Sequence, residues 1–209
     1  MTELILIRHG ETDWNAEHRI QGHLDIPLNS VGLSQAKAIG KRFRDVDIDL
    51  LVSSDLRRAI QTIAPISEWR NLPVLRETRL RERHLGVLQG KTPEEAQRFV
   101  PDVFEVFRCR AENAVLAEGE SLSAFAERVI NVLTTMTEEY LGKRIVAVTH
   151  GGVLDIAYRH ATGMLLAAPR RFPIRNASVN TFRADGPKFE LVSWSDVDHL
   201  PDKQAMDEN

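Results

Sequence analysis

The stretch Leu4-Ile5-Leu6-Ile7-Arg8-His9-Gly10-Glu11-Thr12 decides the fold class of this 209-residue chain. It begins with a continuous apolar run that includes β-branched residues. Such a run is typical of a strand that is buried on both faces of a parallel sheet. The run then gives way to polar and charged residues around a glycine. We therefore expect the first strand of an α/β protein, followed by a polar loop at its carboxyl end.

Apolar runs and amphipathic stretches alternate along the rest of the chain. Helical spacing follows the capping residues Asn29 and Ser121, and Gly151-Gly152 opens a further helix. Another helix begins at about Asp55, and we expect Pro65 to limit or bend it. Strands are expected at 4–7, 50–52, 73–78, 145–148, 179–182 and 189–194, the last two as an antiparallel pair. This alternation predicts α/β architecture with a largely parallel sheet.

The length of the chain favours a single domain over residues 1–209. Residues 91–119 fit the alternation poorly, and we expect a small helical insert there, with a helix that begins at Pro101. An insert between core elements is often a lid or a substrate wall, and a packed peripheral helix is the alternative. From about residue 196 to residue 209 the chain is polar and acidic, and we expect this tail to fray.

Composition excludes several classes of protein. Hydrophobic residues make up 43% of the chain and charged residues 27%, which is ordinary for a globular protein. The net charge of −3 argues against binding to nucleic acid or to an anionic membrane. No window approaches the roughly 18 apolar residues of a membrane span, and the N-terminus lacks the basic region of a signal peptide. We expect a cytoplasmic protein.

Polar clusters follow three of the predicted strands. They are Arg8 to Thr12, Ser53 to Arg58, and Thr149 to Gly152. Ligands of open α/β sheets sit beyond the carboxyl ends of the strands, so we expect two histidines and at least two arginines to converge on one crevice. Neither of the glycine-rich nucleotide-binding motifs is present in the chain.

Arginine and histidine at these positions point to phosphate chemistry. Arginine presents a rigid fork of donors that matches phosphate oxygens. A histidine among arginines is disfavoured as imidazolium by like charge, so it is neutral and nucleophilic near pH 7. A lone histidine at a strand end is more often structural, but the joint pattern favours a site that attacks phosphorus and holds its oxygens.

The sequence from Leu6 to Thr12 resembles the signature of the histidine phosphatase superfamily, the phosphoglycerate mutase-like proteins. The resemblance covers nearly the whole chain in the right order, through residues 14–15, 19, 21–22, 27–28, 53–59, 80–82, 119–121 and 148–152. It implies a three-layer α/β/α sandwich with a mostly parallel central sheet.

The resemblance also implies roles for individual residues. His9 is the implied nucleophile, which becomes phosphohistidine, and Glu82 protonates the leaving oxygen and then activates the incoming water or hydroxyl. The residues implied to hold the phosphoryl group and the substrate are Arg8, Arg58 and His150, with Asn15, Gln21, Gly22 and Gly151. The remaining histidines lack metal-ligand spacing, so we expect no metal and no other cofactor.

The sequence from Glu82 to Lys91 is similar to the corresponding segment of the cofactor-dependent mutases, but two features depart from that family. Leu85 stands where those proteins carry a tyrosine, and the insert offers Arg108 and Arg110 separated by Cys109 instead of adjacent arginines that hold a carboxylate. The apolar residues of the insert suggest a pocket wall for less charged groups, and they are Phe99, Val103, Phe104 and Phe107.

The first hypothesis is therefore a phosphomonoesterase that hydrolyses small organic phosphates through a phosphohistidine intermediate. A cofactor-dependent phosphoglycerate mutase, primed by 2,3-bisphosphoglycerate, is the alternative. A non-catalytic phosphate-binding protein with the same fold is a remote alternative, since fold does not fix function. The expected partner is a small phosphorylated metabolite, neither nucleic acid nor membrane is expected to bind, and a homodimer is left open.

Overall fold

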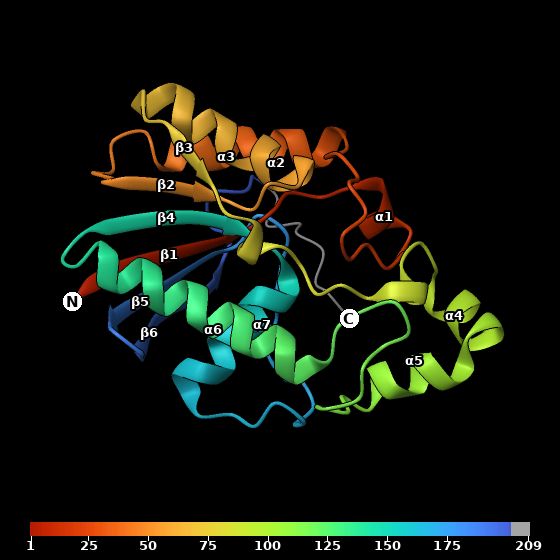
Figure 1. The fold of residues 1–209 in the computed structure, drawn as a ribbon. Helices are drawn as coiled ribbons and strands as arrows, with labels where there is room; N and C mark the ends of the chain where they lie inside the picture. Colours follow the sequence, from red (N-terminus) through yellow and green to blue (C-terminus); the bar gives the residue numbers. More distant parts are fainter. Residues whose placement is uncertain (202–209) are drawn as a thin grey trace.

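The computed structural model describes residues 1–201, and within this range six strands form one sheet (Figure 1). The strands are β1 (Thr2–Arg8), β2 (Leu50–Ser53), β3 (Val74–Arg76), β4 (Arg144–Thr149), β5 (Val179–Asp185) and β6 (Lys188–Asp196). Their order across the sheet is β3-β2-β4-β1-β5-β6. β3, β2, β4 and β1 run parallel to one another, and β5 and β6 add an antiparallel edge next to β1. The expectation of a largely parallel sheet is confirmed.

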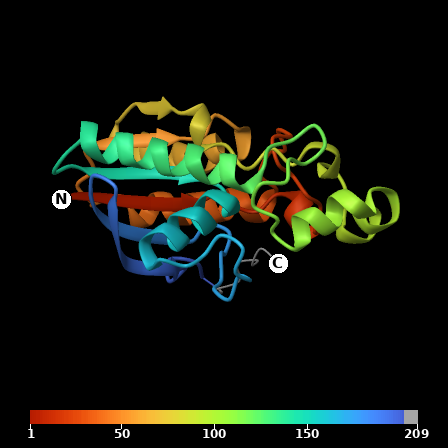
Figure 2. The same ribbon diagram turned by 60° about the horizontal axis from the view of Figure 1, so that its bottom comes forward.

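Helices cover both faces of this sheet (Figures 1 and 2). The helices are α1 (Asp13–Ala16), α2 (Ser30–Arg42), α3 (Arg57–Arg70), α4 (Pro93–Phe99), α5 (Pro101–Arg108), α6 (Leu122–Glu139) and α7 (Gly151–Thr162), with 3₁₀ turns η1 (Thr78–Leu80) and η2 (Gly86–Leu88). α2 and α3 pack on one face, and α6 and α7 on the other. The three-layer α/β/α sandwich implied by the resemblance is confirmed.

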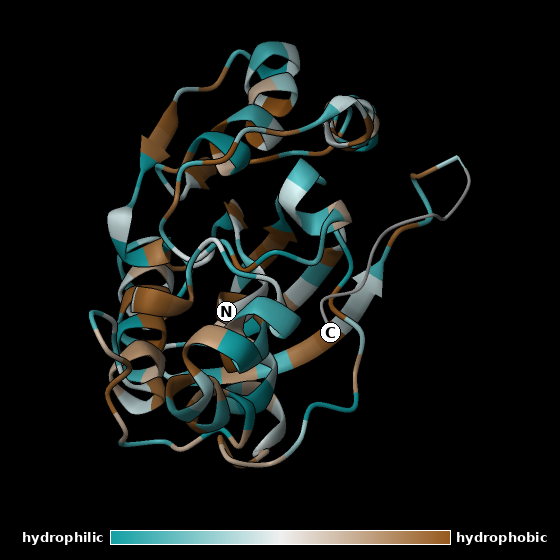
Figure 3. Cartoon of the chain, turned by 90° about the vertical axis from the view of Figure 1, so that its right-hand side faces the viewer, coloured by the Kyte–Doolittle hydropathy of each residue, from teal (hydrophilic) through white to brown (hydrophobic). Residues whose placement is uncertain are grey.

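The first strand shows why its apolar run is continuous. Leu4 and Leu6 point into the core cluster under α6 and α7, whereas Ile5 and Ile7 point into the cluster under α2 and α3. Side chains alternate between the two faces of a strand, so a strand between two helical layers needs apolar residues at every position. Hydrophobic residues accordingly gather on the strands and on one side of the helices (Figure 3).

Capping and packing define the helices. The side chain of Asn29 accepts a hydrogen bond from the Gly32 backbone at the start of α2, as expected for a cap. Pro65 was expected to limit or bend its helix, and the first part is wrong, because α3 continues through Pro65 to Arg70. Pro65 packs against Gly40 of α2, where a side chain would collide with the proline ring. The proline therefore serves the α2–α3 contact.

The insert, residues 91–119, contains two short helices, α4 and α5, where one was expected. Thr92 caps α4 through a reciprocal pair of bonds with Glu95. The insert shares a small core with the segment before it, made of Leu85 and Leu88 together with Ala96, Phe104 and Leu116, with Val103 and Phe107 packed against it. Phe99 is instead exposed on the surface. These apolar residues mainly hold the insert together, which accounts for their number.

The end of the described chain is more ordered than its composition suggests. Val197 and Leu200 are buried in the cluster under α2 and α3, so the segment directly after Asp196 is part of the fold. The polar tail therefore begins later than the expected residue 196, and residues 202–209 lie outside the described range. No helix within residues 1–201 is long and apolar enough to cross a membrane.

The contact between α2 and the loop after β1 tolerates no side chain at Gly32. A Cβ there would overlap the Glu11 carbonyl oxygen, and a Cβ at Gly10 would stand 2.7 Å from the Gly32 oxygen. We expect Gly32→Ala to lower the free energy of unfolding by about 1–3 kcal/mol, as overpacking does. Ser34→Ala, at an exposed position of the same helix, should change it by less than about 0.5 kcal/mol. Urea denaturation of both variants checks this, and equal stabilities would contradict it.

Candidate active site

Three parallel strands bring the site together. β1 pairs with β4 so that Arg8 lies opposite Thr149. The residues that follow, His9 and His150, are therefore side by side, with ring centroids 5.3 Å apart. The backbone of Ser54, directly after β2, bonds to Val148 at 2.9 Å and brings the start of α3 to the same edge. The expected convergence at the carboxyl ends of the strands is observed.

His9 is buried and held in one tautomer. Its Nδ1 lies 2.7 Å from the Gly10 carbonyl oxygen, which can only accept a hydrogen bond, so Nδ1 carries the proton. Burial lowers the pKa of His9 well below its usual value, and the nearby Arg58 and Arg8 add to this. The ring is therefore neutral, with a lone pair on Nε2. A neutral imidazole with a free lone pair is a nucleophile.

The backbone around His9 is fixed by groups from two segments, the loop before β5 and helix α3. The His9 carbonyl oxygen accepts the Ala177 N–H at 3.2 Å and the Asn176 Nδ2 at 3.1 Å. The Gly10 N–H donates to the Thr62 hydroxyl at 2.9 Å. These bonds place the imidazole on a backbone with little freedom to shift.

Two buried arginines flank His9. Arg8 donates to the Ile174 carbonyl oxygen at 2.7 Å. Arg58, which is fully buried, donates from Nη1 to Leu24 and from Nη2 to Gly22, both at 2.8 Å. Guanidinium groups keep their charge when buried, so the site around His9 is positive. This suits the recognition of a phosphoryl group.

His150 is fully buried, and both of its ring nitrogens contact protein groups. Nδ1 accepts from Arg58 Nε at 3.2 Å, and Nε2 lies 2.8 Å from the Ser54 hydroxyl. Burial lowers its pKa well below the usual value, with further contributions from Arg58 and His9. To touch a phosphoryl oxygen directly, the ring would have to exchange one of these bonds.

Glu82 is a buried carboxyl that is oriented by backbone groups. Its two oxygens accept the Arg83 N–H at 2.8 Å and the Gly152 N–H at 2.9 Å. Gly152 lies in the first turn of α7, where backbone N–H groups attract negative charge. A Cβ at this glycine would overlap the carboxyl group, which accounts for the glycine at that position.

The residues expected to contact substrate lie in α1, in the loop after it and at the start of α7. Asn15 lies in α1, and its Oδ1 accepts the backbone and hydroxyl groups of Thr12 at 3.1 and 3.0 Å, so its amide nitrogen faces the other way. Gly22 is buried with φ +52° and holds Arg58 through its carbonyl. Gln21 precedes it, with Oε1 buried and without a partner among the described residues. Gly151 begins α7, directly after His150.

A comparison with known families decides the identity. The model that describes the histidine phosphatase superfamily (branch 1) matches residues 4–197. The chain belongs to the histidine phosphatase superfamily.

Relatives of this superfamily carry phosphatase and mutase names. "Phosphoglycerate mutase-like protein 4" of Arabidopsis thaliana is 41% identical over 202 residues, which cover 95% of this chain and 86% of the relative. "Metal-independent phosphoserine phosphatase" of the same plant is 38% identical over 203 residues, which cover 96% and 84%. The prediction of a phosphoryl-transfer enzyme, with phosphatase favoured over mutase, is confirmed.

Solved structures agree with this assignment. "Bacillus stearothermophilus YhfR" superposes with a TM-score of 0.86 at 31% identity, covering 95% of this chain and 99% of that one. A phosphoserine phosphatase from Entamoeba histolytica, solved in complex with 3-phosphoglyceric acid, gives a TM-score of 0.83 at 27% identity, covering 96% and 100%. The prediction of a reaction without metal agrees with the name of the metal-independent phosphoserine phosphatase of Arabidopsis thaliana.

The two arginines beside Glu82, Arg81 and Arg83, differ in their partners. Arg81 forms a two-bond ion pair with Asp55, at 2.5 and 2.7 Å, so it is partnered rather than simply solvated. Arg83 is buried and donates to the Glu120 carbonyl oxygen. Burial lowers the pKa of Arg83 to about 10, so it is still a cation at neutral pH.

Sequence reasoning missed Ser54 and Asn176 as partners of the central histidines, and Thr62 as the partner of Gly10. Ser54 lies within the quoted cluster after β2, but its position gave no sign that the hydroxyl meets His150. Asn176 lies in a loop without periodic pattern, and only the fold brings it to His9.

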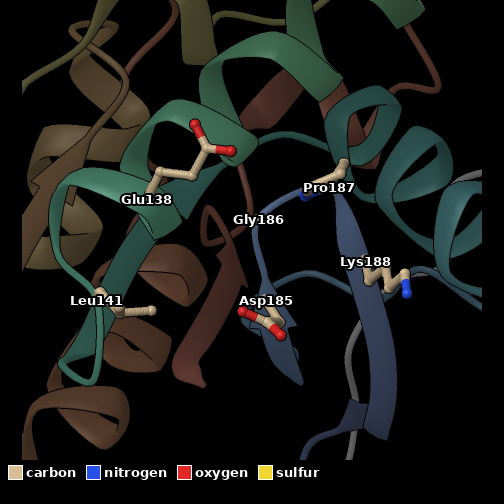
Figure 4. A pocket seen from close by; sticks show the side chains of 6 residues that line it. All are labelled: Glu138, Leu141, Asp185, Gly186, Pro187 and Lys188. Carbon is tan, nitrogen blue, oxygen red and sulfur yellow. The ribbon is translucent and has the colours of Figure 1, made fainter.

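A separate hollow of about 410 Å³ lies at the opposite end of the sheet, beside the turn between β5 and β6 (Figure 4). Glu138 and Leu141 line it from one side and residues 185–188 from the other. None of the predicted site residues lines it. The hollow is therefore not part of the His9 site.

The burial of His9 gives a direct spectroscopic prediction. A group whose folded-state pKa is depressed stays neutral below its ordinary titration range. We expect the His9 ring signals in NMR spectra to stay unchanged between about pH 7.5 and pH 5.5, whereas in urea they should titrate near pH 6.5. His9→Gln identifies the signals by their loss. A folded-state midpoint near pH 6.5 would contradict the neutral nucleophile.

Proposed function

We propose that this protein is a metal-independent phosphomonoesterase in which His9 carries the phosphoryl group. The observation that carries the proposal is the state of His9: neutral, with Nδ1–H tied to Gly10, between the buried cations Arg8 and Arg58. The substrates are small phosphorylated metabolites, and the proposed location is the cytoplasm.

In the first half-reaction, Nε2 of His9 attacks phosphorus. The bond from phosphorus to the ester oxygen breaks, its electron pair stays on that oxygen, and protonated Glu82 supplies the proton that makes the alcohol. Arg8 and Arg58 stabilise the charge on the three phosphoryl oxygens, with the Asn15 amide as a further donor. His9 keeps its Nδ1 proton through the bond to Gly10.

In the second half-reaction, the Glu82 carboxylate takes a proton from water and the water oxygen attacks phosphorus. The phosphorus–nitrogen bond breaks, its electrons return to Nε2 of His9, and inorganic phosphate leaves. Glu82 is again protonated. Dividing the reaction into two displacements lets one carboxyl act first as acid and then as base.

The surroundings of Glu82 bear on the leaving group. Arg83 is a buried cation next to this carboxyl, so leaving groups that carry a carboxylate are favoured there. Such substrates would resemble phosphoserine and 3-phosphoglyceric acid, which the names of two relatives contain. Leu85, which replaces the tyrosine of the mutases, is buried in the core of the insert. This supports hydrolysis over a mutase reaction, in which the substrate must be retained.

The test of this function is His9→Ala. We expect the wild-type protein to release phosphate from p-nitrophenyl phosphate and phosphoserine, also in EDTA, and to form an alkali-stable, acid-labile phosphoenzyme. His9→Ala should lose both. His160→Ala, at an exposed histidine of α7, should stay within about twofold, as a surface change does. Full activity in His9→Ala, or label on another residue, would refute the mechanism.

Glu82→Gln tests the general acid. Proton transfer of this kind contributes about 10²–10⁴-fold, and most where the leaving group is a poor one. We expect phosphoenzyme formation, measured by rapid quench, to slow far more for phosphoserine than for p-nitrophenyl phosphate. Glu120→Gln alters a nearby carboxylate that pairs with Arg128 and should slow neither. Equal slowing of both substrates in Glu82→Gln would mean that Glu82 is structural.

A further inference from the structure

Ser54 contacts the site in a way that the proposed mechanism does not use. It follows β2 directly and is fully buried. Its hydroxyl lies 2.8 Å from Nε2 of His150, and its own backbone nitrogen bonds to Val148 of β4. The hydroxyl is therefore held against the ring by two strands of the central sheet.

The contacts of His150 assign its tautomer. Arg58 Nε always carries a hydrogen, so its 3.2 Å bond requires a lone pair on Nδ1 of His150. The single proton of the neutral ring is then on Nε2, and it is donated to the Ser54 oxygen. Without an acceptor at Ser54, the buried Nε2–H would be unsatisfied, and moving the proton to Nδ1 would set two N–H groups against each other at Arg58.

Arg58 depends on this ring for one of its anchors. Nη1 and Nη2 donate to carbonyl oxygens of the loop at Leu24 and Gly22, and Nε donates to His150. The first two bonds lead to the loop at residues 22–24, whereas His150 directly follows β4. The bond to His150 ties Arg58 to the strand pair that also carries His9.

We propose that Ser54 is a positioning residue that fixes the tautomer of His150 and, through it, aligns Arg58 with the phosphoryl group on His9. The proposal rests on the proposed function for the role of Arg58. It adds a relay, Ser54 to His150 to Arg58, in which the serine touches neither substrate nor nucleophile.

The first experiment reads the tautomer without any assay of activity. Nitrogen-15 NMR of the wild-type protein should show the His150 ring with a protonated Nε2 and an unprotonated Nδ1, the signals being assigned by their loss in His150→Gln. Protonated Nδ1 in the wild type would overturn the proposal, whatever the variants do.

The second experiment compares two neighbouring serines. Ser54→Ala should lower kcat and the affinity for vanadate, a mimic of the transferring phosphoryl group, by about tenfold each, or about 1.4 kcal/mol, with KM changed less than threefold. Ser53→Ala is the matched control, because Ser53 is equally buried but donates to the Ser54 carbonyl, not to His150. It should leave kcat, vanadate affinity and the His150 spectrum unchanged.

Rescue and folding separate positioning from general damage. Ser54→Thr keeps the hydroxyl and should retain the wild-type tautomer and recover most of kcat, with thermal unfolding measured for every variant. Wild-type kcat and vanadate affinity in folded Ser54→Ala would overturn the relay while leaving the proposed function intact. Failure of the proposed function shows differently, as full activity in His9→Ala.

Discussion

The site depends first on the parallel pairing of β1 with β4. That pairing sets Arg8 opposite Thr149, and the next residue of each strand is a histidine. Parallel strands end at the same edge, so a slip of one residue in register would turn one imidazole to the other face of the sheet. The apolar residues of β1 prevent the slip, because Leu4 and Leu6 fill one core and Ile5 and Ile7 the other. The geometry of the chemistry is thus a consequence of how the core is packed.

Burial at this edge has an electrostatic consequence. Arg58 and the two central histidines are almost fully buried, and the histidines respond by losing their charge while the arginine keeps its own. Desolvation is the main cause of both depressed pKa values, ahead of repulsion from the arginines. The same burial therefore prepares a neutral nucleophile and leaves a positive environment for an anion. Glu82, the proposed acid and base, is oriented by its bond to the first turn of α7.

Much of the fold and of the central site could be predicted from the sequence, because both rest on local patterns. The run at the start of the chain, the caps Asn29 and Ser121, and the clusters at the strand ends all depend on neighbouring residues. The features that sequence reasoning missed depend on residues that are far apart in the sequence. Pro65 lies inside α3 with its ring against Gly40 of α2, a contact between residues far apart in the sequence. The partners of the histidines, Ser54 and Asn176, belong to this second class.

The insert shows how one family scaffold can change its chemistry without changing its catalytic edge. Leu85, three residues after Glu82, turns into a small core with Leu88 and Phe104. An apolar side chain at that place stabilises the insert by burial, about 25 cal/mol for each Å² of apolar surface, but it offers no hydrogen bond to a substrate. Arg110, a cation of the insert, donates a hydrogen bond to the Asp155 carboxylate at 2.6 Å. Leu85 and Arg110 thus hold the insert in place, which agrees with a reaction in which water is the acceptor.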